Sequence, residues 1–298
     1  SSNLNTIGAL CFLAKLKFMQ IALTCPMCKK PLGSGGNLNF NFYHHVISAI
    51  AEKENKTSIV LIGESMGGTI ALYAASKMQD KIKAIATCST AHRGGNLQHV
   101  SAWKHQIVDD GLESWSSDML EKRFFPNSVT DDTLDWFHKA QCNSDPKSIL
   151  EMARLLVTSD LTPELNKILS PVLLMHPDSS PFIPLDIPVE LKALLPAGQL
   201  KLIPKARHGI ACSHARDCAI ELAKGWGIRA TYFCVMSVGF VSKWGATFLR
   251  QNAASSCITC QAWARFPSAS ACQKSRRVWT IRAMRFSESE TSIRAVTM

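Results

Sequence analysis

Thr57-Ser58-Ile59-Val60-Leu61-Ile62-Gly63-Glu64-Ser65-Met66-Gly67-Gly68 is the stretch that decides the fold. The apolar and β-branched residues of its first half are typical of a short buried strand, and the Ala- and Leu-containing residues 69–75 predict a helix directly after it. Between them lies a G-x-S-x-G sequence. Small residues two positions before and after Ser65 permit a tight turn that lifts its hydroxyl out of the sheet. This context favours a serine nucleophile over a turn with a purely structural role.

The start of the helix after Ser65 is the second chemical feature of this stretch. The first N–H groups of a helix have no acceptor within the helix and point out of its N-terminus. The backbone N–H of Met66 is therefore predicted to be one donor to the oxyanion that forms when a serine attacks a carbonyl.

Strand and helix patterns alternate on both sides of the G-x-S-x-G sequence. The predicted strands are 19–23, 58–62, 81–88, 171–176 and 199–203, and the predicted helices are 40–53, 69–75, 186–195 and 213–225. This alternation indicates a mostly parallel α/β sheet. Residues 91–170 interrupt it with helical patterns that carry Trp103, Trp115 and Trp136. An insertion of this kind predicts a helical lid over the strand ends.

A serine nucleophile needs a base, and the base needs an acid to orient it. In this architecture the acid and then the histidine follow the serine along the chain. We favour His208 as the base because it follows a strand, lies in a turn and precedes the last helix; His214 is the alternative. For the acid, Asp178 lies in the loop after the 171–176 strand, and Asp186 stands further on.

From about residue 16 to residue 226 the chain resembles the α/β-hydrolase superfamily, and within it the 3-oxoadipate enol-lactonases. The Gly63–Gly68 segment carries the superfamily resemblance. The narrower resemblance rests on short segments of the lid: Ser101-Ala102-Trp103, Leu120-Glu121-Lys122-Arg123-Phe124-Phe125, Ser144-Asp145-Pro146 and Asp160-Leu161-Thr162-Pro163.

The resemblance implies an α/β-hydrolase fold over residues 1–225, with Ser65 as nucleophile and His208 as base. It also implies a hydrolase without cofactor or metal that opens an ester or lactone of a small carboxylated molecule. Trp103 and Trp136 would shape an apolar pocket. The lid arginine expected near Trp103 to bind a substrate carboxylate is absent there, and Arg123 is the candidate to replace it.

The chain also departs from the family at the acid loop. The family motif resembles His-Gly-x-x-Asp-x-x-x-Pro, whereas this chain has His176-Pro177-Asp178-Ser179-Ser180-Pro181-Phe182-Ile183-Pro184. Ser180 therefore stands in the place of the family aspartate, and Asp178, two residues earlier, is the expected substitute.

A second departure concerns the N-terminal part. The His-Gly loop that supplies the second oxyanion N–H in the family would fall before Ser1, together with the strand that precedes it. We therefore expect N-terminal strands of the sheet to be missing, including the neighbour of the 58–62 strand. The loss of one oxyanion donor slows such enzymes by about 10²–10³.

The basic character of the chain comes from its end. The formal net charge is +10, and residues 226–298 contain ten Lys and Arg residues against only Glu288 and Glu290. We expect this Ser-, Cys- and Arg-rich segment to be disordered or extraneous, and no nucleic-acid partner. Eleven cysteines without regular spacing indicate reduced thiols and a cytoplasmic protein, and no apolar stretch is long enough to span a membrane.

Three functions are compatible with these patterns. The first is a serine hydrolase of the enol-lactonase type that acts on a small ester or lactone through an acyl-enzyme. The second is a carboxylesterase or lipase-like enzyme that acts on neutral esters. The third is a non-catalytic protein that keeps the fold but lacks a full oxyanion hole.

Overall fold

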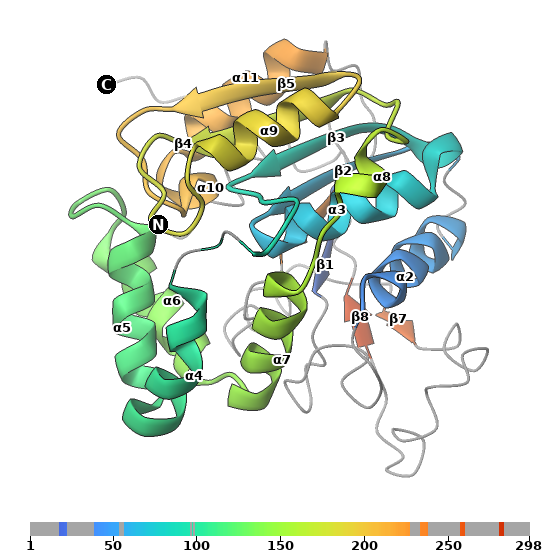
Figure 1. Ribbon diagram of the computed structural model, residues 1–298. Coiled ribbons are helices and arrows are strands. Elements are labelled where there is room, and N and C mark those ends of the chain that lie inside the picture. Colours follow the sequence, from blue (N-terminus) through green and yellow to red (C-terminus); the bar gives the residue numbers. More distant parts are fainter. Residues whose placement is uncertain are drawn as a thin grey trace, which may run out of the picture.

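The computed structural model describes residues 18–22, 39–53, 57–95, 97, 99–226, 233–237, 257–259 and 280–282. Within this part a parallel sheet forms the centre of the molecule (Figure 1). Its strands, in spatial order, are β1 (Phe18–Ala22), β6 (Phe233–Ser237), β2 (Ile59–Glu64), β3 (Ile82–Cys88), β4 (Val172–Pro177) and β5 (Gly198–Ile203). All neighbouring pairs are parallel. The predicted α/β fold is confirmed.

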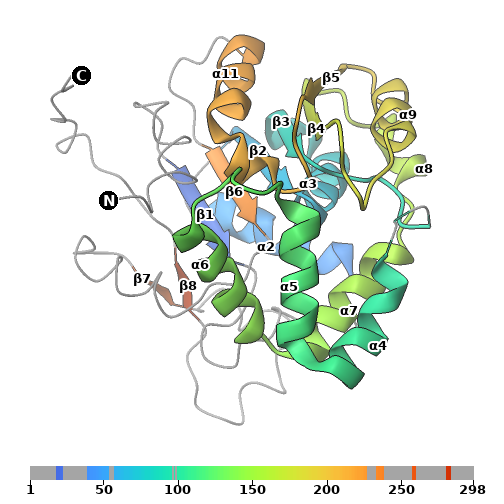
Figure 2. The ribbon, with the colours of Figure 1, turned by 90° about the vertical axis from the view of Figure 1, so that its left-hand side faces the viewer.

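Alternate residues of β2 face two different apolar layers, as the two-residue period of a strand requires. Ile59 and Leu61 belong to a core shared with helices α2 (Phe40–Lys53), α3 (Met66–Lys77) and α9 (Asp186–Leu194). Val60 and Ile62 belong to a second core, shared with α11 (Ala215–Trp226). Figure 2 shows α11 on one side of the strands and α9 on the other. Burial on both faces explains why the sequence of β2 begins with a continuous run of apolar residues.

The chain between β3 and β4 is mostly helical, and α5 and α7 stand below the sheet in the view of Figure 1. Its elements are η2 (Val100–Ala102), α4 (Trp103–His105), η3 (Gln106–Asp110), α5 (Gly111–Arg123), α6 (Asp131–Cys142), α7 (Pro146–Val157) and α8 (Thr162–Leu165). Trp115 and Met119 of α5 pack in one apolar cluster with Phe182 and Ile187, which follow β4. This cluster attaches the helical insertion to the loop that was predicted to hold the catalytic acid.

Two of these helices begin at residues suited to that position. The Thr130 side chain accepts the N–H of Thr133 at the start of α6, and the Asp145 carboxylate accepts the N–H of Ser148 at the start of α7. Pro146 occupies the first turn of α7, where no backbone N–H is needed. Local sequence therefore fixes where these helices start, while the apolar cluster fixes where they pack.

One strand of the sheet comes from the segment after residue 226. β6 pairs with β1 on one side and with β2 on the other, where Leu61 lies opposite Cys234. It lies beside β2, where the sequence predicted the loss of an N-terminal strand, and it comes instead from the C-terminal segment. Residues 233–237, for which disorder was expected, form this strand. A central strand such as β2 needs backbone partners on both edges, and the apolar run at 233–236 can supply them.

The remaining described parts of this segment are short. β7 (Cys257–Thr259) and β8 (Thr280–Arg282) form an antiparallel pair. The rest of residues 227–298, for which disorder was expected, lies outside the described residues, and so do residues 1–17.

After β5 the chain forms a short loop, the one-turn helix α10 (Ile210–Ser213) and then α11. β4 and β5 are in register up to their last residues, with Pro177 opposite Ile203. The segments that follow these two strands therefore start side by side, and they carry the predicted acid and the predicted base.

Candidate active site

Ser65 lies on the turn between β2 and α3, as the sequence predicted. Its backbone has φ 53° and ψ −123°, a strained conformation for a residue with a side chain. The turn is held by a hydrogen bond from Ser65 N–H to the Cys88 carbonyl, 2.8 Å, and by one from Gly68 N–H to the Ser65 carbonyl, 2.9 Å. At Gly63 a Cβ atom would lie 2.4 Å from the Gly67 carbonyl oxygen. The turn therefore needs glycine at the first position of G-x-S-x-G.

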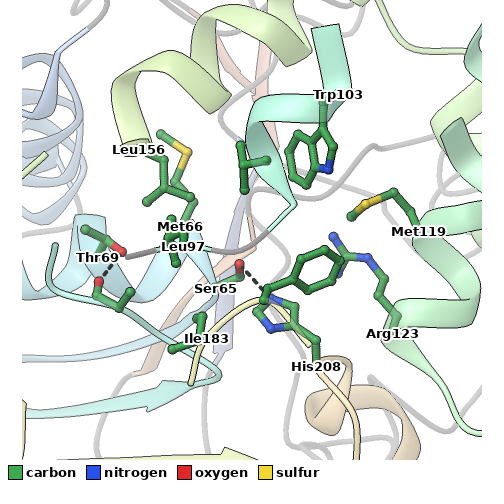
Figure 3. Close-up of a pocket in the computed structure, with 13 residues that line it drawn as sticks. Ser65, Met66, Thr69, Leu97, Trp103, Met119, Arg123, Leu156, Ile183 and His208 are labelled. Atoms are coloured by element: carbon green, nitrogen blue, oxygen red, sulfur yellow. Dashed lines mark hydrogen bonds between the residues drawn. The ribbon is translucent and has the colours of Figure 1, made fainter. Parts of the chain in front are cut away.

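His208 contacts Ser65 although the two residues come from distant parts of the sequence. Its Nε2 lies 2.9 Å from Ser65 Oγ, although the two residues are 143 positions apart (Figure 3). The backbone around the imidazole is fixed as well, because Ser89 Oγ donates to the His208 carbonyl at 2.6 Å. The alternative base, His214, instead contacts Ser213 Oγ through Nδ1. The structure thus brings Ser65 and His208 together and leaves His214 outside the pair.

The acid predicted for this pair is not in contact with it. The Asp178 carboxylate accepts the backbone N–H groups of Lys205 at 2.8 Å and Ala206 at 3.1 Å. Because Asp178 directly follows β4, the strand register places it against the turn after β5, where it caps that turn. Asp186, the alternative, is exposed at the start of α9. Both assignments are corrected by this geometry.

Ser180 holds the position that a catalytic acid would take. Its Oγ lies 3.3 Å from His208 Nδ1, the ring nitrogen that faces away from Ser65. In the family motif that the acid loop resembles, Ser180 stands in the place of aspartate, and here its hydroxyl faces His208 Nδ1. A neutral hydroxyl therefore stands behind the histidine.

Three influences lower the pKa of His208 well below its ordinary value. Burial of the ring is the largest, followed by the positive charge of Arg123 and by the nearby His176. All three disfavour the imidazolium form. His208 is therefore neutral at physiological pH, as a general base must be, but its imidazolium form is poorly stabilised.

A pocket opens above the serine hydroxyl. Its cavity volume is about 30 Å³, so the pocket is narrow. Trp103 and Arg123 line it beside Ser65 and His208, as Figure 3 shows. Its apolar walls include side chains that the sequence did not single out: Leu97, Met119, Leu156, Phe182 and Ile183. Of these, Phe182 and Ile183 were recognisable only as neighbours of the acid loop.

Trp136, predicted as a third pocket residue, lies elsewhere. It is 40% exposed on α6 and packs edge-on against Phe137, with ring centroids 4.9 Å apart. It is not among the pocket-lining residues. The sequence-based assignment is wrong because α6 turns its neighbour Phe137 inward, toward Phe124, and leaves Trp136 on the outer face.

Two polar groups of the pocket walls have no hydrogen-bond acceptor in the described structure. These are Nε of Arg123 and Nε1 of Trp103, both buried. The charged residue that most affects Arg123 is Glu64, and the Arg123 charge in turn opposes the rise that burial causes in the pKa of Glu64. The pocket therefore offers unpaired donors and positive charge a short way from the nucleophile.

The backbone N–H of Met66, the predicted oxyanion donor, stands at the N-terminus of α3, and Met66 lines the pocket. Its role remains a prediction. Among the described residues no group of three or more His, Cys, Asp or Glu side chains is placed to hold a metal ion.

His176 makes the fold sensitive to acid. It is buried in β4, where its Nε2 donates to the Ile183 carbonyl at 3.2 Å and its Nδ1 has no partner. Burial lowers its pKa from 6.5 to about 4. As the pH falls below 6.5, the unfolded chain binds a proton at His176 before the folded chain does. The free energy of unfolding is therefore unaffected by His176 above pH 6.5 and declines by roughly 3 kcal/mol as the pH falls toward 4.

This decline is measurable by urea denaturation at pH 7.5, 5.5 and 4.5. The loss of stability between the first and last pH should be smaller in His176→Leu than in the wild-type chain, because the variant cannot bind the proton in either state. An unchanged pH dependence in the variant would contradict this account. His208 titrates in the same direction, so part of the decline should remain.

The family described as serine aminopeptidase, S33, matches residues 41–212, which is more than half of the chain and includes Ser65 and His208. The chain belongs to this family. It is therefore a member of the α/β-hydrolase superfamily, as the resemblance of the G-x-S-x-G segment implied.

A relative of this α/β-hydrolase among curated proteins is distant in sequence. It is similar to the AB hydrolase superfamily protein YisY of Bacillus subtilis (strain 168), with 26% identity over 162 residues that cover 50% of this chain and 59% of YisY. The chain thus spans less than two thirds of that relative.

Solved structures agree on the fold. An esterase from Exiguobacterium antarcticum superposes with a TM-score of 0.57 at 18% identity, over 64% of this chain and 74% of the esterase. The enol-lactonase of Burkholderia xenovorans LB400 gives a TM-score of 0.57 at 16% identity, over 65% and 75% of the two chains. At such identities the likeness concerns the α/β-hydrolase fold alone. In the described part of the chain, no helix combines the length and the apolarity needed to cross a membrane.

Proposed function

We propose that this α/β-hydrolase cleaves a small ester or lactone through an acyl-enzyme on Ser65. The observation that carries the proposal is the 2.9 Å contact between Ser65 Oγ and His208 Nε2. A hydroxyl held at positive φ at the mouth of a helix, with a neutral imidazole at hydrogen-bond distance, is the arrangement that acyl transfer requires. Membership in a hydrolase family supports the same reaction class.

In the proposed reaction, His208 Nε2 takes the hydroxyl proton while Ser65 Oγ forms a bond to the substrate carbonyl carbon. The carbonyl oxygen becomes an oxyanion that the Met66 N–H stabilises. When the tetrahedral intermediate collapses, His208 returns its proton to the departing alkoxide and an acyl-enzyme remains. Water then attacks the acyl carbon and gives its proton to His208. When the bond from Ser65 Oγ to the acyl carbon breaks, His208 returns this proton to Ser65 Oγ and the acid product leaves.

The unpaired donors of the pocket support a carboxylated substrate. Arg123 Nε and Trp103 Nε1 are buried without acceptors, and a buried donor left unpaired costs free energy. A carboxylate offers up to four acceptor positions and suits the guanidinium geometry. This is the basis for proposing a substrate of the type that the enol-lactonase resemblance implied, with a neutral ester as the competing possibility.

Arg123→Met should separate these two substrate classes. p-Nitrophenyl hydrogen succinate and p-nitrophenyl butyrate share a leaving group and similar acyl length but differ by one carboxylate. We expect kcat/KM for the charged ester to fall by about 10- to 100-fold in the variant, because hydrogen bonds to charged groups contribute about 1.5–3 kcal/mol. Hydrolysis of the neutral ester should change less than about threefold.

Lys122→Met is the matched control, since Lys122 carries the same charge on the next residue of α5 but pairs with Asp118. It should leave both rates nearly unchanged. Equal turnover of the two esters by the wild-type protein would instead select the carboxylesterase alternative. Failure of the folded protein to turn over any ester would favour the non-catalytic alternative.

A further inference from the structure

Ser180 is tied to the catalytic pair at one side and to the backbone at the other. Its Oγ accepts the N–H of Ile183 at 3.2 Å and lies 3.3 Å from His208 Nδ1. Resting on the proposed function, we infer that Ser180 is the positioning residue of His208 and that its hydroxyl, in place of a carboxylate, limits the rate at which Ser65 is activated. A carboxylate at position 180 is then sufficient to raise that rate.

The hydrogen-bonding capacity of the Ser180 hydroxyl decides what it can do for His208. An Oγ atom has one hydrogen to donate and two lone pairs to accept with. The Ile183 N–H occupies one lone pair. Ser180 can therefore either accept a hydrogen bond from His208 Nδ1–H with the other lone pair, or donate a hydrogen bond from its own O–H to an unprotonated Nδ1.

These two arrangements have opposite consequences at Ser65. When Nδ1 carries the hydrogen, Nε2 is a free base that can take the Ser65 proton. When Ser180 donates to Nδ1, the neutral ring carries its hydrogen on Nε2, which then cannot act as a base. A carboxylate accepts only, so it permits the productive tautomer alone, and in an intact triad its replacement by a neutral amide lowers kcat by about 10⁴. Ser180 orients the ring without selecting its tautomer.

The charges around His208 add to this effect. The groups that act on the ring are Arg123, on α5, and His176, on β4, and both disfavour its protonated form. The nearest predicted acid, Asp178, is engaged with the backbone of Lys205 and Ala206. The His208 imidazolium that forms during the attack of Ser65 is thus stabilised by the neutral Ser180 hydroxyl, and the positive charge of Arg123 opposes it.

Position 180 is not fully enclosed by the protein. Ser180 is half-buried, and Ser179 before it is exposed. Aspartate adds a carboxyl group in place of the hydroxyl, and the 3.3 Å separation from Nδ1 is longer than the roughly 2.7–2.9 Å of a charge-assisted hydrogen bond. A side-chain rotation can therefore seat a carboxylate oxygen on the Nδ1–H.

The experiment compares Ser180→Asp with Ser180→Asn, which has the same shape without the charge, and with Ser180→Ala. The measured quantity is the second-order rate constant for covalent labelling of Ser65 by a fluorophosphonate, followed by intact mass between pH 5 and 9. Ser180→Asp should label about 10- to 10³-fold faster than wild type, with its pH midpoint moved upward. Ser180→Asn should stay within about threefold of wild type, and Ser180→Ala should be about 10-fold slower.

The outcomes distinguish this inference from the proposed function. Equal labelling rates and pH midpoints for the Asp and Asn variants, with wild-type labelling intact, would overturn the inference alone. Labelling that is absent from all four folded proteins would overturn the proposed function. Labelling that is slow in wild type and appears strongly only in Ser180→Asp would support both. Thermal denaturation of each variant shows whether a slow rate reflects unfolding.

Discussion

Ser65→Ala should abolish fluorophosphonate labelling of the protein and lower ester hydrolysis by at least about 10³-fold. The reason is chemical, because the variant removes the only atom that Ser65 contributes to the bond with the substrate carbonyl and leaves the pocket otherwise intact. Removal of the nucleophile in a serine hydrolase is among the most damaging single changes known. Intact mass after incubation with the probe measures the first effect, and p-nitrophenyl ester turnover measures the second.

The fold should survive this change. Alanine keeps the Cβ atom of Ser65, so the backbone at φ 53° is no more strained than before, and the melting temperature should move by less than about 2 °C. Ser58→Ala is a suitable control because Ser58 is exposed just before β2, and it should keep full labelling. An adduct that persists in Ser65→Ala would show that the probe reacts at another residue and would remove Ser65 as nucleophile.

The features that the sequence predicted well are those set by local physical constraints. An apolar strand, a small-residue turn and a helix follow one another at Ile59–Lys77, and steric exclusion at Gly63 enforces the turn. His208 was recognisable because the base of this architecture must come from the turn between the last strand and the last helix. At both places the reaction requires a particular residue type, and the order of strands and helices along the sequence shows where that residue must stand.

The misassigned residues depend on contacts that no local pattern encodes. Asp178 is two residues before the expected place in the sequence, yet the register of β4 with β5 sets it against the N–H groups after β5. Trp136 and Phe137 are adjacent on α6, and the orientation of the helix about its axis decides which of the two rings faces inward. Sequence composition could indicate an aromatic lid, but the direction in which each ring points was decided by packing.

The sequence did not predict strand β6, and the reason differs from that for Asp178 and Trp136. Its apolar residues 233–236 are too few to distinguish a buried strand from a short apolar stretch by periodicity, and its neighbours in the sheet, β1 and β2, lie far away in the sequence. Parallel pairing of this kind is specified by the unfilled edge of β2 rather than by any signal within the strand itself. Sequence order therefore predicted an open position beside β2, and the structure fills it from the other end of the chain.

The pH dependence of labelling follows from the surroundings of His208. Burial and the charge of Arg123 lower its pKa well below its ordinary value, so the ring stays neutral and able to accept a proton as the pH drops through 6.5. The labelling rate of the wild-type protein should therefore remain close to its maximum at pH 6 and decline only in more acidic solution. A midpoint at or above pH 6.5 would contradict a buried neutral base.

His208→Ala should lower the labelling rate by about 10³-fold or more, and added imidazole should restore part of it. Ser65 alone is a weak nucleophile without a base within hydrogen-bond distance. The loop should keep its place in the variant, because Ser89 Oγ is bonded to the backbone carbonyl of residue 208 and Gly209 N–H to the Arg123 carbonyl, contacts that do not involve the imidazole. The labelling rate measured with 0 to about 100 mM imidazole checks this. Since a structural defect cannot be repaired by a free base, rescue would assign His208 to the chemistry, whereas a folded variant that labels at the wild-type rate would remove it from the reaction.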